Sequence, residues 1–179
     1  MNPMTPVHAA DHTRGPANAP LTIVQYGDYD CPHTRASHGI LAGLIPSLGH
    51  DVRFVFRYFP LRHLHAHAEL LAEIAEAAAR QNKFWPMHDH LMAHRRGVTR
   101  DNVIADAADA GVVLEAIDQA VGTPEIRARI DADVASGKAS GVHSTPTFFF
   151  NGVLFDGHYD DQTLRGKIAE VMGQGGRSD

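Results

Sequence analysis

The chain has 179 residues, of which 44% are apolar, and a formal net charge of −5. This length and composition suit one packed domain, and the acidic balance argues against nucleic acid as a partner. No apolar run approaches the ~18 residues that a membrane-spanning helix needs. Residues 1–20 lack the apolar stretch of a signal peptide and a single cysteine suits a reducing compartment, so we expect a cytoplasmic protein with no membrane partner.

The first third of the chain predicts a strand, a helix and a second strand. Residues 1–14 are polar, and we expect them to form a flexible arm. The short, β-branched run Leu21–Tyr26 predicts a buried strand. Pro32 suits the first turn of a helix, because its missing N–H is not needed there, and apolar residues then recur at helical spacing. Val52–Phe59 predicts the second strand.

The rest of the chain predicts a helical block followed by a hairpin and a closing helix. Residues 62–138 carry helical apolar spacing without strand signals, so we expect a helical insertion there. Residues 147–155 predict a β-hairpin, since Asn151-Gly152 is a preferred pair for a two-residue turn. Thr163–Met172 predicts the last helix. This order predicts an α/β architecture with a four-stranded mixed sheet.

The only cysteine, Cys31, follows the first predicted strand in the motif Cys31-Pro32-His33-Thr34. A thiol at a helix N-terminus is favoured in its thiolate form. The Thr34 hydroxyl and first-turn N–H groups would add hydrogen bonds to the sulfur, and a protonated His33 would add positive charge. These features predict an ionised sulfur within reach of solvent. The alternative is an inert cysteine that only contributes packing.

The chain resembles the DsbA-like group of thioredoxin-fold proteins in three segments. Residues 15–34 resemble the first strand and active-site turn of the group. Residues 54–68 resemble its second strand and the start of its helical insertion, and residues 141–152 resemble its cis-proline loop and hairpin. The resemblance implies a thioredoxin-like fold, with one domain over residues 1–179 and the helical insertion within it.

The active-site motif departs from the pattern of that group at two positions. The group carries Cys-Pro-x-Cys, whereas here Thr34 stands in place of the second cysteine, so this is a single-cysteine variant. Many members also carry an acid six residues before the first cysteine, where this chain has Gln25. The absence of the second cysteine and the absence of the acid are consistent with each other, because in that group the acid serves the second thiol. Asp28 and Asp30 precede the motif; we expect them to form the turn, although their charges would oppose a thiolate.

Thr145-Pro146 precedes the third predicted strand and forms the second candidate site. The resemblance implies a cis peptide bond here, with Pro146 against the Cys31 sulfur and the backbone of Thr145 pairing with an extended substrate. It also implies that the proline keeps metal away from the sulfur. From the residues alone, a turn proline before a strand remains the alternative.

Histidine is abundant, with thirteen in the chain. Two groups are close together in the sequence: His63, His65 and His67, and His88, His90 and His94. A zinc site needs three or four converging ligands, and no glutamate follows His90 as a metalloprotease motif would require. We therefore expect these histidines to lie on solvated helix faces and expect no metal site.

These features predict a thiol–disulfide oxidoreductase that works by a monothiol mechanism through Cys31. We expect no bound cofactor, with glutathione or a similar low-molecular-weight thiol as co-substrate. The expected partner is a disulfide-containing or thiol-modified protein or a small thiol, and the chain would be a monomer or weak homodimer. One alternative is a redox-inactive module that binds a peptide or ligand beside Pro146. Another is a glutathione-dependent isomerase or transferase, in which the Thr34 hydroxyl orients the glutathione thiolate.

Overall fold

The computed structural model describes residues 3–93 and 98–175 of the chain. His94, from the second histidine group, lies outside these ranges. Among the described residues, no helix is long and apolar enough to cross a membrane.

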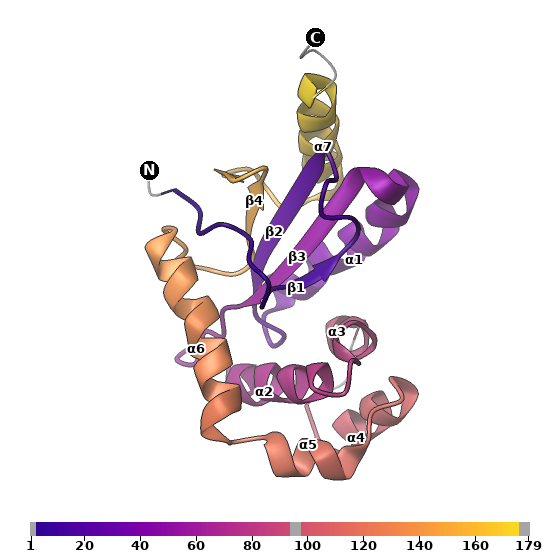
Figure 1. Ribbon diagram of the computed structural model, residues 1–179, viewed down its shortest axis with the longest axis vertical. Coiled ribbons are helices and arrows are strands. Elements are labelled where there is room, and N and C mark those ends of the chain that lie inside the picture. Colours follow the sequence, from indigo (N-terminus) through magenta and orange to yellow (C-terminus); the bar gives the residue numbers. More distant parts are fainter. Residues whose placement is uncertain (1–2, 94–97, 176–179) are drawn as a thin grey trace.

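The centre of the fold is a mixed sheet with the strand order β1-β3-β2-β4-β5 (Figure 1). The strands are β1 (His12–Arg14), β2 (Leu21–Gly27), β3 (Val52–Tyr58), β4 (Thr147–Phe150) and β5 (Val153–Leu154). β2 runs parallel to β3 and antiparallel to β4, and β1 and β5 are antiparallel edge strands. The predicted α/β thioredoxin-like fold is confirmed, but the sheet has five strands rather than four.

The additional strand lies in residues 1–14, which were expected to form a flexible arm. β1 pairs with β3, and the segment before it is held by Arg57, which is fully buried. Its guanidinium donates to both carboxylate oxygens of Asp11 at 2.8 Å, and to the backbone carbonyls of Thr5 and Pro6. The Asp11 carboxylate and two backbone carbonyls thus provide acceptors for a buried cation, a role that the polar composition of the segment did not indicate.

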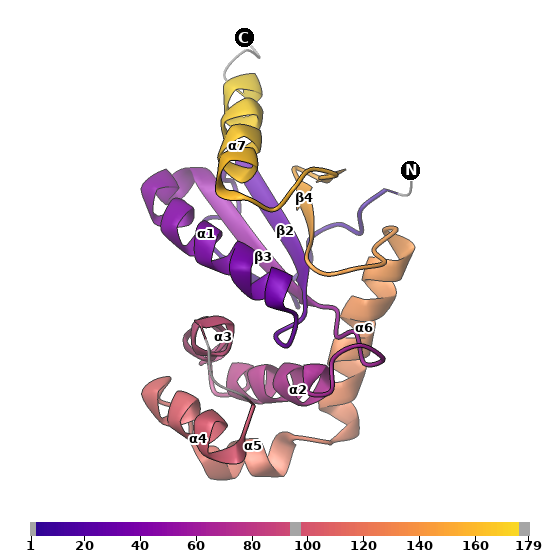
Figure 2. The same ribbon diagram turned by 180° about the vertical axis from the view of Figure 1, so that it is seen from behind.

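Helices cover both faces of the sheet, and residues of β2 alternate between them as strand geometry requires. Ile23 belongs to the core with α1 (Pro32–Leu48) and α7 (Asp161–Gly175), which Figure 2 shows in front of the sheet. Val24 belongs to the smaller core on the opposite face, where α6 (Pro124–Ala139) packs. Both residues are fully buried, so the sheet is sandwiched between two apolar layers.

The helical block lies between β3 and β4, within the chain segment expected to form an insertion. It contains α2 (Ala68–Ala79), α3 (Phe84–Ala93), α4 (Arg100–Asp109) and α5 (Leu114–Ala120), and it ends with α6. Figure 1 shows α2 to α5 packed beneath the sheet, with α6 leading the chain back beside it. A short 3₁₀ helix, η1 (Gly49–Asp51), joins α1 to β3.

The hairpin between β4 and β5 is confirmed at Asn151-Gly152. Both residues have positive φ, 48° and 83°, as a type I′ turn requires. The Asn151 side chain also accepts a hydrogen bond from Thr22 N at 2.7 Å and donates one to Pro20 O at 3.0 Å. The turn therefore holds the start of β2 as well as reversing the chain.

Candidate active site

Cys31 is the N-cap residue of α1, and Pro32 occupies the first turn. The turn is closed by two backbone hydrogen bonds, from Cys31 N to Asp28 O and from Arg35 N to Cys31 O, both 3.1 Å. The Cys31 thiol donates to the backbone carbonyl of Thr145 at 3.3 Å. Cys31 is only 3% exposed, so the expectation of a sulfur within reach of solvent is wrong for this conformation.

The loop before β4 lies directly against this thiol. The Thr145–Pro146 peptide bond is cis, as the resemblance implied. Thr145 is 8% exposed, and within the described ranges its buried Oγ1 has no hydrogen-bond partner. The structure thus brings Cys31 and Thr145 together across 114 positions of sequence.

The other motif residues lie in two different environments. His33 and Pro32 are exposed, whereas Thr34 is fully buried. Thr34 Oγ1 accepts a hydrogen bond from Asp28 N at 3.5 Å, and the Cys31 side chain makes no capping hydrogen bond to the first turn of α1. The expected donors to the sulfur are therefore not in place, and in this conformation the thiol is itself the donor.

The two acids before the motif hold the turn, as expected. The Asp28 carboxylate is buried and accepts from Asp30 N and Leu61 N, both at 2.9 Å, and it lies 2.7 Å from His65 Nδ1. Asp30 accepts from His67 N at 3.0 Å. Both carboxylates thus fix the loop after β3 against the active-site turn. His65 and His67 are their partners in that loop, a role that the sequence spacing of these histidines did not reveal.

Gln25 lies beneath α1 and is fully buried. Its Nε2 donates to Ser37 Oγ at 3.4 Å, and its Oε1 has no partner among the described residues. The position that carries an acid in many DsbA-like proteins therefore holds a neutral amide paired with a neutral hydroxyl.

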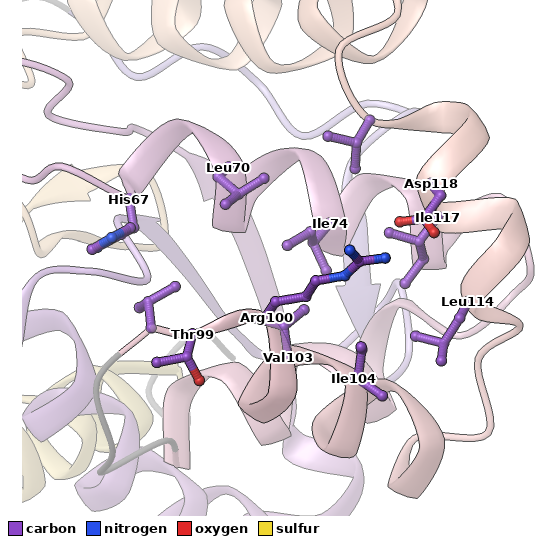
Figure 3. A pocket seen from close by; sticks show the side chains of 12 residues that line it. His67, Leu70, Ile74, Thr99, Arg100, Val103, Ile104, Leu114, Ile117 and Asp118 are labelled. Atoms are coloured by element: carbon purple, nitrogen blue, oxygen red, sulfur yellow. The ribbon is translucent and has the colours of Figure 1, made fainter.

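Two cavities could hold a ligand, one beside the cis-proline loop and one in the helical block, away from the active-site turn. A groove of about 280 Å³ lies beside the cis-proline loop and is lined by residues that include Leu61, His63, Lys138 and His143. A second cavity of about 380 Å³ lies in the helical block, with Arg100 extending across an apolar lining (Figure 3). No residue of the active-site motif or of Thr145-Pro146 lines the second cavity.

Comparison with known proteins places these features in a family. A family model described as thioredoxin matches residues 8–170. The chain is 36% identical over 168 residues to the Na⁺/H⁺ antiporter NhaA of Herminiimonas arsenicoxydans, and 35% identical over 162 residues to Na⁺/H⁺ antiporter NhaA 1 of Salinispora arenicola. These matches cover 94% and 90% of this chain but only 26% and 25% of the antiporters. The chain thus spans about a quarter of the length of those relatives.

Solved structures agree with this assignment. A thioredoxin-like oxidoreductase from Silicibacter pomeroyi has a TM-score of 0.79 at 25% identity, with 93% of this chain and 94% of that chain covered. BdbD from Bacillus subtilis has a TM-score of 0.79 at 18% identity, covering 96% and 97%. The thiol-disulfide exchange protein α-DsbA2 from Wolbachia pipientis has a TM-score of 0.78 at 21% identity, covering 91% and 88%. The family match over residues 8–170 shows that the chain belongs to the thioredoxin family, and the solved structures agree with its thioredoxin-like fold.

Proposed function

We propose that this protein is a thiol–disulfide oxidoreductase that works by a monothiol mechanism through Cys31. The observation that carries the proposal is the placement of the thiol, at the N-terminus of a 17-residue helix and 3.3 Å from the Thr145 carbonyl in the cis-proline loop. A helix N-terminus favours the thiolate, which is the nucleophile in disulfide exchange. Membership of the thioredoxin family, together with the similarity to a thioredoxin-like oxidoreductase from Silicibacter pomeroyi, supports the same proposal.

The chemistry needs two exchange steps. The Cys31 thiolate attacks the small-thiol sulfur of a disulfide between a substrate and a small thiol. This forms a mixed disulfide between Cys31 and the small thiol, and expels the substrate sulfur as a thiolate. A second small thiol, such as glutathione, then attacks the mixed disulfide and releases Cys31. In the net reaction, the mixed disulfide of the substrate and one free small thiol become the free substrate thiol and the disulfide of the small thiol, while Cys31 returns to its starting state. Since Cys31 is the only cysteine in these 179 residues, no second thiol of this domain can release it, and we propose that the releasing thiol is a small molecule.

Burial of the thiol sets a condition on the first step. At 3% exposure, and with its proton directed at Thr145 O, Cys31 reacts only after that contact is displaced. An extended substrate that pairs with the backbone of Thr145 would compete for the same carbonyl. Substrate binding would then free the sulfur at the moment of attack.

The same burial favours one rival, a redox-inactive module that binds a peptide or ligand beside the cis-proline loop. In that case Cys31 would serve only as a packing residue and hydrogen-bond donor. The transferase alternative finds no such support, because the Thr34 hydroxyl is fully buried and accepts a hydrogen bond from Asp28 N. For the oxidoreductase we propose a reducing compartment such as the cytoplasm, where small thiols are abundant in reduced form.

Trapping of the mixed disulfide distinguishes the two functions. Folded protein is incubated with oxidised glutathione and its intact mass is measured, with Cys31→Ser and urea-unfolded protein as controls. We expect one glutathionyl adduct on the folded protein, its removal by reduced glutathione, and no adduct on Cys31→Ser. An adduct that forms only on the unfolded protein would favour the binding module and contradict the oxidoreductase.

A further inference from the structure

A second polar cluster lies where α1, which covers one face of the sheet, contacts α3, which Figure 1 shows below the sheet. His38 comes from α1, and His88 and Asp89 come from α3. Each offers one ligand atom, two imidazole nitrogens and one carboxylate oxygen, and these atoms lie within 4.8 Å of one another. His38 Nε2 is 3.8 Å from Asp89 Oδ1. We call these three residues the His–His–Asp cluster.

His88 is the buried member of the cluster and has an unused nitrogen. It is fully buried, with Nδ1 2.9 Å from the Tyr29 hydroxyl. Its Nε2 is also buried and has no hydrogen-bond partner in the described part of the chain. Unpaired buried polar atoms are rare in folded proteins and each needs an explanation. When Nδ1 donates its proton to Tyr29, Nε2 carries a free lone pair, as in histidines that bind metal.

The cluster lines a cavity of about 560 Å³, which has room for a cation with bound water.

Arg14 holds the third ligand in place. Its guanidinium donates to Asp89 Oδ2 at 2.7 Å and lies 4.4 Å from the centre of the Trp85 ring. This leaves Asp89 Oδ1 facing His38. The positive charge of Arg14 also opposes a cation, so we expect micromolar rather than tighter affinity.

From these observations we propose that the His–His–Asp cluster binds one divalent transition-metal ion of the zinc class. Two imidazole nitrogens and one carboxylate oxygen form a typical ligand set for Zn²⁺, whose fourth position would open to the cavity. Bonds of about 2.1 Å would draw the three ligand atoms together by about 1 Å, within reach of side-chain rotation. This site is separate from the active-site motif and does not depend on the function proposed for Cys31.

The sequence did not predict this site because its ligands lie on two helices fifty positions apart. The two groups of histidines that are close in sequence suggested other combinations, and neither included His38. Within the described residues, the only metal-type cluster of three or more ligands is the one formed by His38, His88 and Asp89.

Metal titration of untagged protein tests the proposal. Zn²⁺ affinity and stoichiometry are measured by competition with a chromophoric chelator, and Co²⁺ is used as a probe whose visible absorption reports its coordination. We expect one bound ion, and about tenfold or greater loss of affinity in both His38→Gln and Asp89→Asn. These two side chains are partly exposed, so both variants should fold even if a change at His88 does not.

Matched controls separate this site from adventitious binding by other histidines. His90→Gln, on the same helix, and the double variant His63→Gln/His67→Gln should keep the affinity and the Co²⁺ spectrum of the unmodified protein. Wild-type affinity in both His38→Gln and Asp89→Asn would overturn the proposal. So would the absence of stoichiometric binding, or loss of the ion only in the His63/His67 double variant.

Discussion

Replacing Asp11 with asparagine should strongly destabilise the fold, because it leaves the buried Arg57 guanidinium without its counter-charge. Both side chains are 0% exposed, and two hydrogen bonds of 2.8 Å join them. Hydrogen bonds to charged groups contribute about 1.5–3 kcal/mol each. Removing one partner of a buried ion pair costs about 3–5 kcal/mol, which agrees with two such bonds.

The effect is measured as the free energy of unfolding in urea at pH 7. A loss of about 3–5 kcal/mol would lower the urea midpoint by more than about 1 M, since small domains have slopes of about 1–3 kcal/mol per M. Arg165→Gln is the matched control, because its pair with Asp161 on α7 is exposed and should change little. A loss below about 1 kcal/mol in Asp11→Asn would refute a structural role for this pair.

The same pair predicts a pH dependence. Burial raises the pKa of Asp11, but hydrogen bonds from Arg57 and from the His8 backbone outweigh it, so the folded-state pKa is lowered. A carboxyl group with a lowered pKa stabilises the fold above its unfolded pKa of about 4, and this contribution is lost as the pH falls through the folded value. The difference between wild type and Asp11→Asn should therefore shrink below about pH 4.

Two further substitutions test packing and the hairpin. Gly137→Ala should lower the free energy of unfolding by about 1–3 kcal/mol, because the new Cβ would lie 2.8 Å from the Phe59 ring. Gly166→Ala is the control: its Cβ would meet open space, so the free energy of unfolding should rise slightly. Equal effects of the two substitutions in urea unfolding would contradict this packing. Asn151→Ala should cost about 1–3 kcal/mol through two lost hydrogen bonds and a positive φ; an unchanged midpoint would show that the turn does not hold the start of β2.

Local signals in the sequence were sufficient for most of the fold. The hairpin was predicted because Asn151-Gly152 carries its own backbone preference, and β2 because its run is short and rich in β-branched residues. β1 was missed since three residues of ordinary composition become a strand only through pairing with β3. The same holds for Arg57, whose charge gave no sign that residues 5–11 would enclose it.

The residues of the candidate site were predicted from the sequence, but the burial and hydrogen bonding of the Cys31 thiol were not. The motif around Cys31 and the cis bond before Pro146 followed from the resemblance. The burial of the thiol depends on Thr145, which is 114 positions away, so no local pattern could report it. The expected role of the Thr34 hydroxyl failed for a similar reason, because folding directs it toward Asp28 N.

The most direct test of the account is turnover of a glutathionylated peptide by the folded protein in the presence of reduced glutathione. We predict that the wild-type protein releases the free peptide thiol catalytically, while Cys31→Ser shows only the uncatalysed rate. Equal rates for the two proteins, with the peptide bound by both, would contradict thiol chemistry at Cys31 and leave the chain as a binding module on a thioredoxin fold.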